Sequence, residues 1–271
     1  MAIPPILSEK RYEAPSVFTA QNLLREARRQ KSLAKVAVPR ICVLDPDGDI
    51  VRYLTATNQA QLEKNWACYH TRLYTFVRHN CPIGIIGCAV GASFAVLVAE
   101  ELFASGCELL ISITCAGQIT ALGEPPYFIL IEQALRDEGT SYHYLPPISY
   151  ATLNADLRAL LADAFTASPV PMYRGASWTT DAPFRETATA IEYALAEGLL
   201  AVEMEAAALY AFAQARVQRV VCFAHVTNQM GRIEGDFEKG NEDGSQDALQ
   251  IIARTASVWA AAQAPSATGH N

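Results

Sequence analysis

Charged residues are scarce in this chain of 271 residues. They make up only 18% of the sequence, whereas hydrophobic residues make up 51%, which excludes a disordered or fibrous protein and predicts a sizeable core. The 21 basic side chains are outnumbered by 28 acidic ones, which gives a net charge of −7. Because an acidic surface repels nucleic-acid backbones and anionic membranes, we expect neither as a partner. Any bound phosphate then requires a local site.

Paired cysteines and metal-ligand motifs are also lacking. The seven cysteines are an odd number without CxxC or CxxH spacing, which argues against a disulfide framework and against a zinc site. Several lie in apolar runs, where a reduced cysteine acts as a small hydrophobe. This use of cysteine predicts a reducing cytoplasm. The N-terminus, MAIPPILSEKRYEAP, has no basic region before an apolar core, so we expect no signal peptide.

One uncharged stretch, residues 81–99, is long enough to span a membrane. It is interrupted by a proline and three glycines, and its character changes halfway. The first half, 82–88, is typical of a buried strand, and residues 92–105 continue as a helix that ends before Gly106. We therefore expect a strand, a turn and a helix rather than a membrane span.

The first 40 residues differ from the rest. Residues 22–35 (NLLREARRQKSLAK) predict a densely basic helix with few leucines, either solvated on the surface or docked on a partner subunit. No linker or repeat divides residues 41–271. We therefore predict an N-terminal extension, 1–40, followed by one catalytic domain, 41–271.

Strands and helices alternate in that domain. A strand at 82–88, a helix at 92–105 and a strand at 109–114 form a βαβ unit, which implies parallel strands with a right-handed crossover. Further strands are expected at 41–44, 127–130, 173–178, 199–202 and 220–226, and further helices at 185–197, 203–215 and 247–262. The fold class is α/β, a single domain with a mixed central sheet flanked by helices. Ligands of such sheets bind at the carboxyl ends of strands.

The glycines of the βαβ unit do not match a dinucleotide site. Gly84, Gly87 and Gly91 do not form G-x-G-x-x-G, and the second strand ends in Ser-Ile-Thr without an acidic residue. The chain also has no G-x-S-x-G elbow, no H-E-x-x-H and no P-loop. We expect neither an organic cofactor nor a metal.

The most informative string is VEMEAAAL, residues 202–209, where a strand passes into a helix. Two carboxylates flank a methionine there. A carboxylate accepts hydrogen bonds from both hydroxyls of a ribose diol, and a thioether packs on the apolar face of a sugar. Glutamates are also favoured in the first turn of a helix by the helix dipole, so a purely structural role stays open.

This string resembles the ribose-binding signature of the nucleoside phosphorylase family, which includes purine nucleoside phosphorylases, uridine phosphorylases and related nucleosidases. Five further segments are similar to the family in the expected order: VGASFAVLVAEELFASG, LLISITCAGQI, RDEGTSYHYLPP, GASWTTDAPFRET and VCFAHVTNQ. The resemblance spans about residues 41–255. It implies the family's α/β fold and cleavage of the N-glycosidic bond of a nucleoside.

The resemblance also implies positions for sugar and base. Glu203, Met204 and Glu205 fall at the ribose, with Glu205 as the catalytic diol ligand. The residues beside the nucleobase are Gly117, Phe184, Arg185 and Asn228. Asn228 stands where purine enzymes of the family carry an aspartate acid. An amide can hydrogen-bond a base carbonyl, which favours a pyrimidine or 6-oxopurine, although a turn residue after a strand is the simpler alternative.

The phosphate site departs from the family. GDIVR resembles the family's G-D-P-G-R loop, which makes Gly48 and Arg52 phosphate contacts. The second phosphate arginine is replaced by Ser112, and the threonine after it by Cys115. Neither can grip phosphate as an arginine fork does. Arg52 also has a simpler interpretation, as a surface salt-bridge partner.

Two further features bear on this site. The arginine that a neighbouring subunit lends in the family falls near residues 69–72 without a clean match. Amides at residues 91–93, at the start of a helix, are expected to assist anion binding.

Three functions follow from the resemblance. Phosphorolysis to pentose 1-phosphate and free base is favoured, with phosphate as co-substrate and no other cofactor. Hydrolysis by a nucleosidase and non-catalytic nucleoside binding are the alternatives. The resemblance further implies a homodimer or a hexamer built from dimers.

Overall fold

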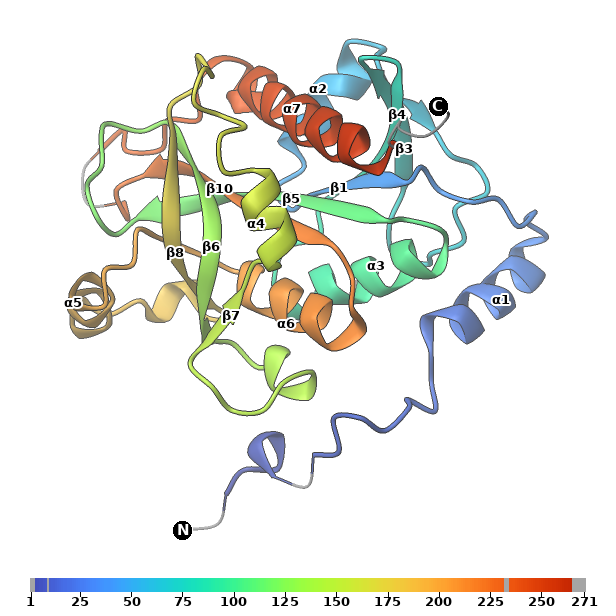
Figure 1. Ribbon diagram of the computed structural model, residues 1–271, viewed down its shortest axis with the longest axis horizontal. Coiled ribbons are helices and arrows are strands. Elements are labelled where there is room, and N and C mark those ends of the chain that lie inside the picture. Colours follow the sequence, from blue (N-terminus) through green and yellow to red (C-terminus); the bar gives the residue numbers. More distant parts are fainter. Residues whose placement is uncertain (1–2, 9, 232–233, 265–271) are drawn as a thin grey trace, which may run out of the picture.

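The computed structural model describes residues 3–8, 10–231 and 234–264 (Figure 1). Its centre is one mixed sheet, which confirms the predicted α/β class. The strands are β1 (Ile41–Asp45), β2 (Gln61–Leu62), β3 (Leu73–Arg78), β4 (Cys81–Gly87), β5 (Leu109–Gln118), β6 (Tyr127–Asp137), β7 (Tyr150–Thr152), β8 (Met172–Thr180), β9 (Ala201–Glu203) and β10 (Val220–Asn228). The helices are α1 (Ala20–Lys31), α2 (Asp49–Ala56), α3 (Ala92–Ala104), α4 (Ala155–Leu160), α5 (Ala188–Ala196), α6 (Ala206–Arg216) and α7 (Ser245–Gln263).

Five strands close into a ring. β5 pairs with β10, β10 with β6, β6 with β8, β8 with β9, and β9 returns to β5. Four further strands form a wing in the order β1, β4, β3 and β2, attached to β5 through β1, and the short β7 pairs with β6. Because β1 and β10 both run parallel to β5, the carboxyl ends of these three strands meet at one place.

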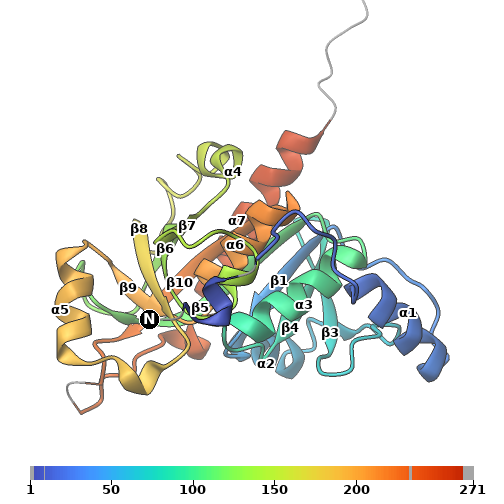
Figure 2. The ribbon, with the colours of Figure 1, turned by 90° about the horizontal axis from the view of Figure 1, so that it is seen from below.

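Helices cover both faces of β1 and β5. α3 and α6 pack against each other below these strands in Figure 1, while α7 lies above them and contacts α2. Figure 2 shows α5 outside the ring at one end of the molecule and α1 at the other. The core strands are almost continuously apolar, as expected for strands covered on both sides.

The predicted βαβ unit is confirmed as β4, α3 and β5. Both strands run parallel to β1, which lies between them. The uncharged stretch 81–99 is thus a strand followed by a helix, and none of the described helices is long and apolar enough to cross a membrane. α2 was not expected, because the glycine and aspartates before it indicated only a turn.

The basic helix α1 packs on its own chain. Leu24 and Ala27 are buried in a small cluster with Ala67, against which Ala104 of α3 packs. Lys31 fixes the C-terminal end of the helix, since its Nζ donates to the carbonyls of Ala67 (2.9 Å) and Cys68 (2.8 Å). α1 is therefore not simply a solvated helix.

Candidate functional site

Glu205 lies at the junction between β9 and α6 and is 1% exposed. Its Oε1 accepts a hydrogen bond from the amide of Gly91 (2.6 Å), and its Oε2 accepts one from the hydroxyl of Thr114 (2.8 Å). Burial, followed by the nearby charge of Glu203, raises the pKa of Glu205 to about 8. The Gly91 amide, expected to assist anion binding, instead orients this carboxyl group.

Glu203 is used differently. Its carboxylate accepts bonds from the hydroxyls of Ser177 and Thr179 and from the amides of Glu205 (2.8 Å) and Ala206 (2.7 Å). These amides belong to the first turn of α6, so Glu203 satisfies donors that the helix itself leaves free. Met204, between the two glutamates, is half-buried. The structure therefore brings the three predicted ribose residues together and gives Glu203 a structural task.

The four predicted base residues are divided between two places. Gly117 and Asn228 are partners across the β5–β10 ladder. A Cβ on Gly117 would collide with Sδ of Met230, which therefore covers this position. In contrast, Phe184 is 100% exposed and Arg185 is also exposed, on the turn Pro183–Arg185 before α5.

Asn228 is held by its own neighbours. Its Oδ1 accepts the amide of Met230 (3.0 Å), and its Nδ2 has only longer contacts, to Thr227 Oγ1 (3.3 Å) and the carbonyl of Ala116 (3.5 Å). The amide group is thus oriented by one firm bond, while its donor side is weakly engaged.

The loop after β1 and the first turn of α2, residues 46–52, carry the predicted phosphate contacts Gly48 and Arg52 and are together termed the anion loop. Gly48 caps α2 with φ 79°, a left-handed conformation that suits glycine. Asp45 closes this turn, because its carboxylate accepts the amides of Gly48 (3.2 Å) and Val51 (2.9 Å). Burial, opposed by these bonds and reinforced by Asp47 and Asp49, raises the pKa of Asp45 to about 7.

Two cations converge on Asp49, which is 6% exposed. Arg52 pairs with its Oδ1, and Lys239 donates to its Oδ2 at 2.5 Å. Arg52 also donates to the carbonyl of Asp47 (3.1 Å), and its side chain is 60% exposed. The predicted loop arginine is therefore present, but it lies among carboxylates.

Ser112 and Cys115, the two β5 residues that differ from the family pattern, have different surroundings. The amide of Cys115 donates to Asp47 Oδ2 (2.8 Å), and its Sγ lies 4.0 Å from Asp49 Oδ2. Burial raises the pKa of the Cys115 thiol, so it stays protonated. Ser112 is buried, and its hydroxyl has no hydrogen-bond partner in the described part of the chain. The structure thus joins Gly48, Arg52 and Cys115 in one place, whereas the Ser112 hydroxyl makes no hydrogen bond to them.

A cavity of about 10 Å³, enough for roughly one water molecule, lies beside the anion loop. Its walls include Asp45, Asp47, Asp49, Thr114, Cys115 and His225. His225 stacks on Phe128 at 4.3 Å, and burial, then the charge of Lys239, lowers the pKa of His225 to about 4. The imidazole is therefore neutral at neutral pH.

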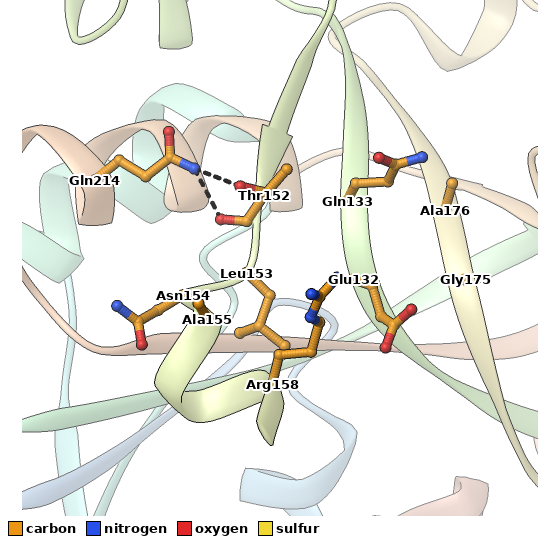
Figure 3. A pocket seen from close by; sticks show the side chains of 10 residues that line it. All are labelled: Glu132, Gln133, Thr152, Leu153, Asn154, Ala155, Arg158, Gly175, Ala176 and Gln214. Atoms are coloured by element: carbon orange, nitrogen blue, oxygen red, sulfur yellow. Dashed lines mark hydrogen bonds between the residues drawn. The ribbon is translucent and has the colours of Figure 1, made fainter. Parts of the chain in front are cut away.

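A wider hollow of about 560 Å³ lies elsewhere, on β6, β7 and β8 beside α4 (Figure 3). Gln214 at the end of α6 reaches it and donates to Thr152. The remaining lining residues are Glu132, Gln133, Leu153, Asn154, Ala155, Arg158, Gly175 and Ala176. None of the residues predicted for sugar, base or phosphate is among them.

Sequence reasoning missed Lys239, Thr114 and the aspartates of the anion loop. The DPDGD run was a visible signal, although it was interpreted as a turn. Thr114 gave a weaker signal, because it follows the substituted Ser112 on β5. The sequence contained no signal for Lys239, since this residue lies 190 positions from its partner Asp49.

The fold of this chain is similar to that of known proteins. The uridine phosphorylase from Vibrio fischeri ES114 complexed with 6-hydroxy-1-naphthoic acid superposes with a TM-score of 0.71 at 20% identity, covering 87% of this chain and 99% of the other. A second structure of uridine phosphorylase from the same organism gives a TM-score of 0.63 at 18% identity, covering 94% and 96%. We found no significant match among curated protein sequences. The model of the phosphorylase superfamily matches residues 40–257, and this chain therefore belongs to that superfamily.

Proposed function

We propose that this protein cleaves the N-glycosidic bond of a ribonucleoside by phosphorolysis, releasing pentose 1-phosphate and the free base. One observation carries the proposal. Thr114, which holds the buried Glu205, and Cys115, whose amide holds the anion loop, are consecutive residues of β5. A sugar on Glu205 therefore has an anion loop beside it. Membership of the phosphorylase superfamily supports the same reaction.

The residues divide the chemistry between the two ends of the nucleoside. Cleavage passes through an oxocarbenium-like transition state, so positive charge develops on the sugar. Ionised Glu205 accepts hydrogen bonds from the ribose hydroxyls, and an anion on the opposite face stabilises the developing charge. Asn228 donates to a carbonyl of the departing base through Nδ2, which its present contacts hold only weakly. This arrangement suits a pyrimidine or a 6-oxopurine.

Hydrolysis is the second candidate, and the position of Asp47 favours it. The Asp47 carboxylate already occupies the Cys115 amide, and the adjacent cavity has the size of one water. A carboxylate beside a bound water can accept its proton as the water attacks the sugar. In that case an internal anion takes the place of phosphate.

Base release from a panel of nucleosides, measured with and without inorganic phosphate, separates these functions. We expect release only with phosphate, together with formation of pentose 1-phosphate. Equal release in both conditions would replace phosphorolysis with hydrolysis. Tight nucleoside binding without release from any member of the panel would contradict catalysis and leave a nucleoside-binding protein on the same fold.

We further propose that the protein is cytoplasmic and works as a homodimer or a hexamer built from dimers. Closed symmetric assemblies of this kind bury apolar surface between copies. Sedimentation analysis at micromolar concentration tests the assembly. A strictly monomeric protein that retains activity would contradict it.

A further inference from the structure

Lys239 belongs to the segment between β10 and α7, far in sequence from the anion loop. Its ammonium group reaches Asp49 Oδ2 at 2.5 Å, and the other oxygen of Asp49 pairs with Arg52. The side chain of Lys239 is 29% exposed and that of Asp49 is 7% exposed, so the pair is largely shielded from water. Two cations that are far apart in the sequence thus share one buried carboxylate at the carboxyl ends of β1 and β5.

The chain positions this lysine through its own hydrogen bonds. Asp236, which is 6% exposed, accepts the amides of Gln229 (2.7 Å) and Gly231 (2.7 Å) and folds the segment back at the end of β10. The amide of Glu238 then donates to the carbonyl of Thr227 (2.8 Å). Residue 239 is therefore held next to the strand end that carries Asn228.

The groups around Lys239 favour its charged form. Partial burial disfavours the ammonium form, but the bond to Asp49 and the charges of Asp49 and Asp47 outweigh it and raise the pKa of Lys239. Lys239 therefore stays charged. Ser112, which stands where the resemblance implies a second phosphate arginine, carries no charge and has no hydrogen-bond partner within the described residues. A second cation for the phosphate site therefore has to come from an element other than β5.

We propose that Lys239 is the second cation of the phosphate site, and that phosphate displaces Asp49 from Lys239 and Arg52 when it binds. This inference rests on the proposed phosphorolysis. In the absence of phosphate, Asp49 pairs with both cations and links Lys239 of the β10–α7 segment to the loop after β1. A phosphate dianion offers more acceptor oxygens to the same donors than one carboxylate does.

Calorimetric titration with inorganic phosphate alone tests the proposal. Removing the charge of Lys239 should weaken phosphate binding, whereas removing the charge of Asp49 should strengthen it. Lys239→Met keeps most of the apolar stem and removes the charge, and we expect it to weaken phosphate binding about tenfold. Asp49→Asn removes the competing carboxylate and should tighten phosphate binding. Lys239→Arg should bind phosphate nearly as well as the parent. Lys64→Met, at an exposed lysine, is the matched control and should leave phosphate binding unchanged.

The outcomes distinguish this inference from the proposed function. If the parent cleaves nucleosides only with phosphate and Lys239→Met binds phosphate as tightly as the parent, phosphorolysis stands and the role of Lys239 is overturned. If Lys239→Met and Asp49→Asn both weaken binding, the pair is a structural tether and the displacement of Asp49 is wrong. If the parent binds no phosphate and cleaves without it, phosphorolysis and the role of Lys239 both fail.

Discussion

The proposed sugar end and the proposed anion end of the site are built in different ways. At the sugar end, Glu203 and Glu205 are almost fully buried, and neutral donors from the backbone and from hydroxyl side chains hold both. At the anion end, carboxylates and cations face one another, and Arg52 is largely exposed. The sugar end is therefore rigid and costly to ionise, whereas the anion end consists of ion pairs that a ligand can exchange.

The sharpest test of the sugar end is Glu205→Gln, which keeps the volume and removes the charge. A hydrogen bond from a ligand to a charged group contributes about 1.5–3 kcal/mol, so kcat/KM for ribonucleosides at about pH 9, where Glu205 is ionised, should fall roughly 10- to 100-fold or more. The fold should persist, which circular dichroism checks. Turnover at the parent rate would mean that the ribose lies elsewhere.

Glu203→Gln should lower the stability of the protein, and this effect distinguishes Glu203 from Glu205. Glu203 accepts four hydrogen bonds while buried, and the amide group of glutamine turns one acceptor into a donor facing other donors. We expect the free energy of unfolding to fall by about 1–3 kcal/mol. Urea unfolding of this variant beside Glu205→Gln measures the contrast. An unchanged midpoint of urea unfolding for Glu203→Gln would contradict a structural role for Glu203.

The pH dependence of nucleoside binding sharpens the comparison further. Because the pKa of Glu205 is raised to about 8, the ionised form that accepts both ribose hydroxyls is a minority at pH 7. Nucleoside affinity should therefore increase about tenfold between about pH 7 and 9. Binding assays across this range check it, and Glu205→Gln should show no such increase.

The raised pKa of Glu205 also predicts a pH dependence of stability. The contribution of Glu205 to stability is lost as pH rises from 4.5 through about 8.

The smallest expected effect concerns Arg52 at the anion end. Its side chain is 60% exposed, so solvent screens its interactions and each is worth about 1 kcal/mol. Arg52→Ala should raise the KM for phosphate roughly fivefold and leave nucleoside affinity without phosphate unchanged. Initial rates over a phosphate titration measure this. A larger change in nucleoside affinity than in the KM for phosphate would place Arg52 at the sugar instead.

The sequence by itself determined the parts of this protein that depend on local pattern. Apolar runs, glycine breaks and helical periodicity predicted the βαβ unit at 82–114. VEMEAAAL predicted the strand–helix junction that holds Glu203 and Glu205, because neighbouring residues of such a junction necessarily lie together. The helix α2 was missed because the residues before it, Asp-Pro-Asp-Gly-Asp, favour a turn when they are considered alone.

Only the tertiary structure decided how distant residues meet. The pairing of Lys239 with Asp49 depends on β1, β5 and β10 running parallel, which brings their carboxyl ends together across 190 positions of chain. The different tasks of Glu203 and Glu205 likewise depend on which donors lie opposite, namely Thr179 for one and Thr114 for the other. Side-chain charge and hydrogen bonding act through space, and sequence spacing alone does not encode those distances.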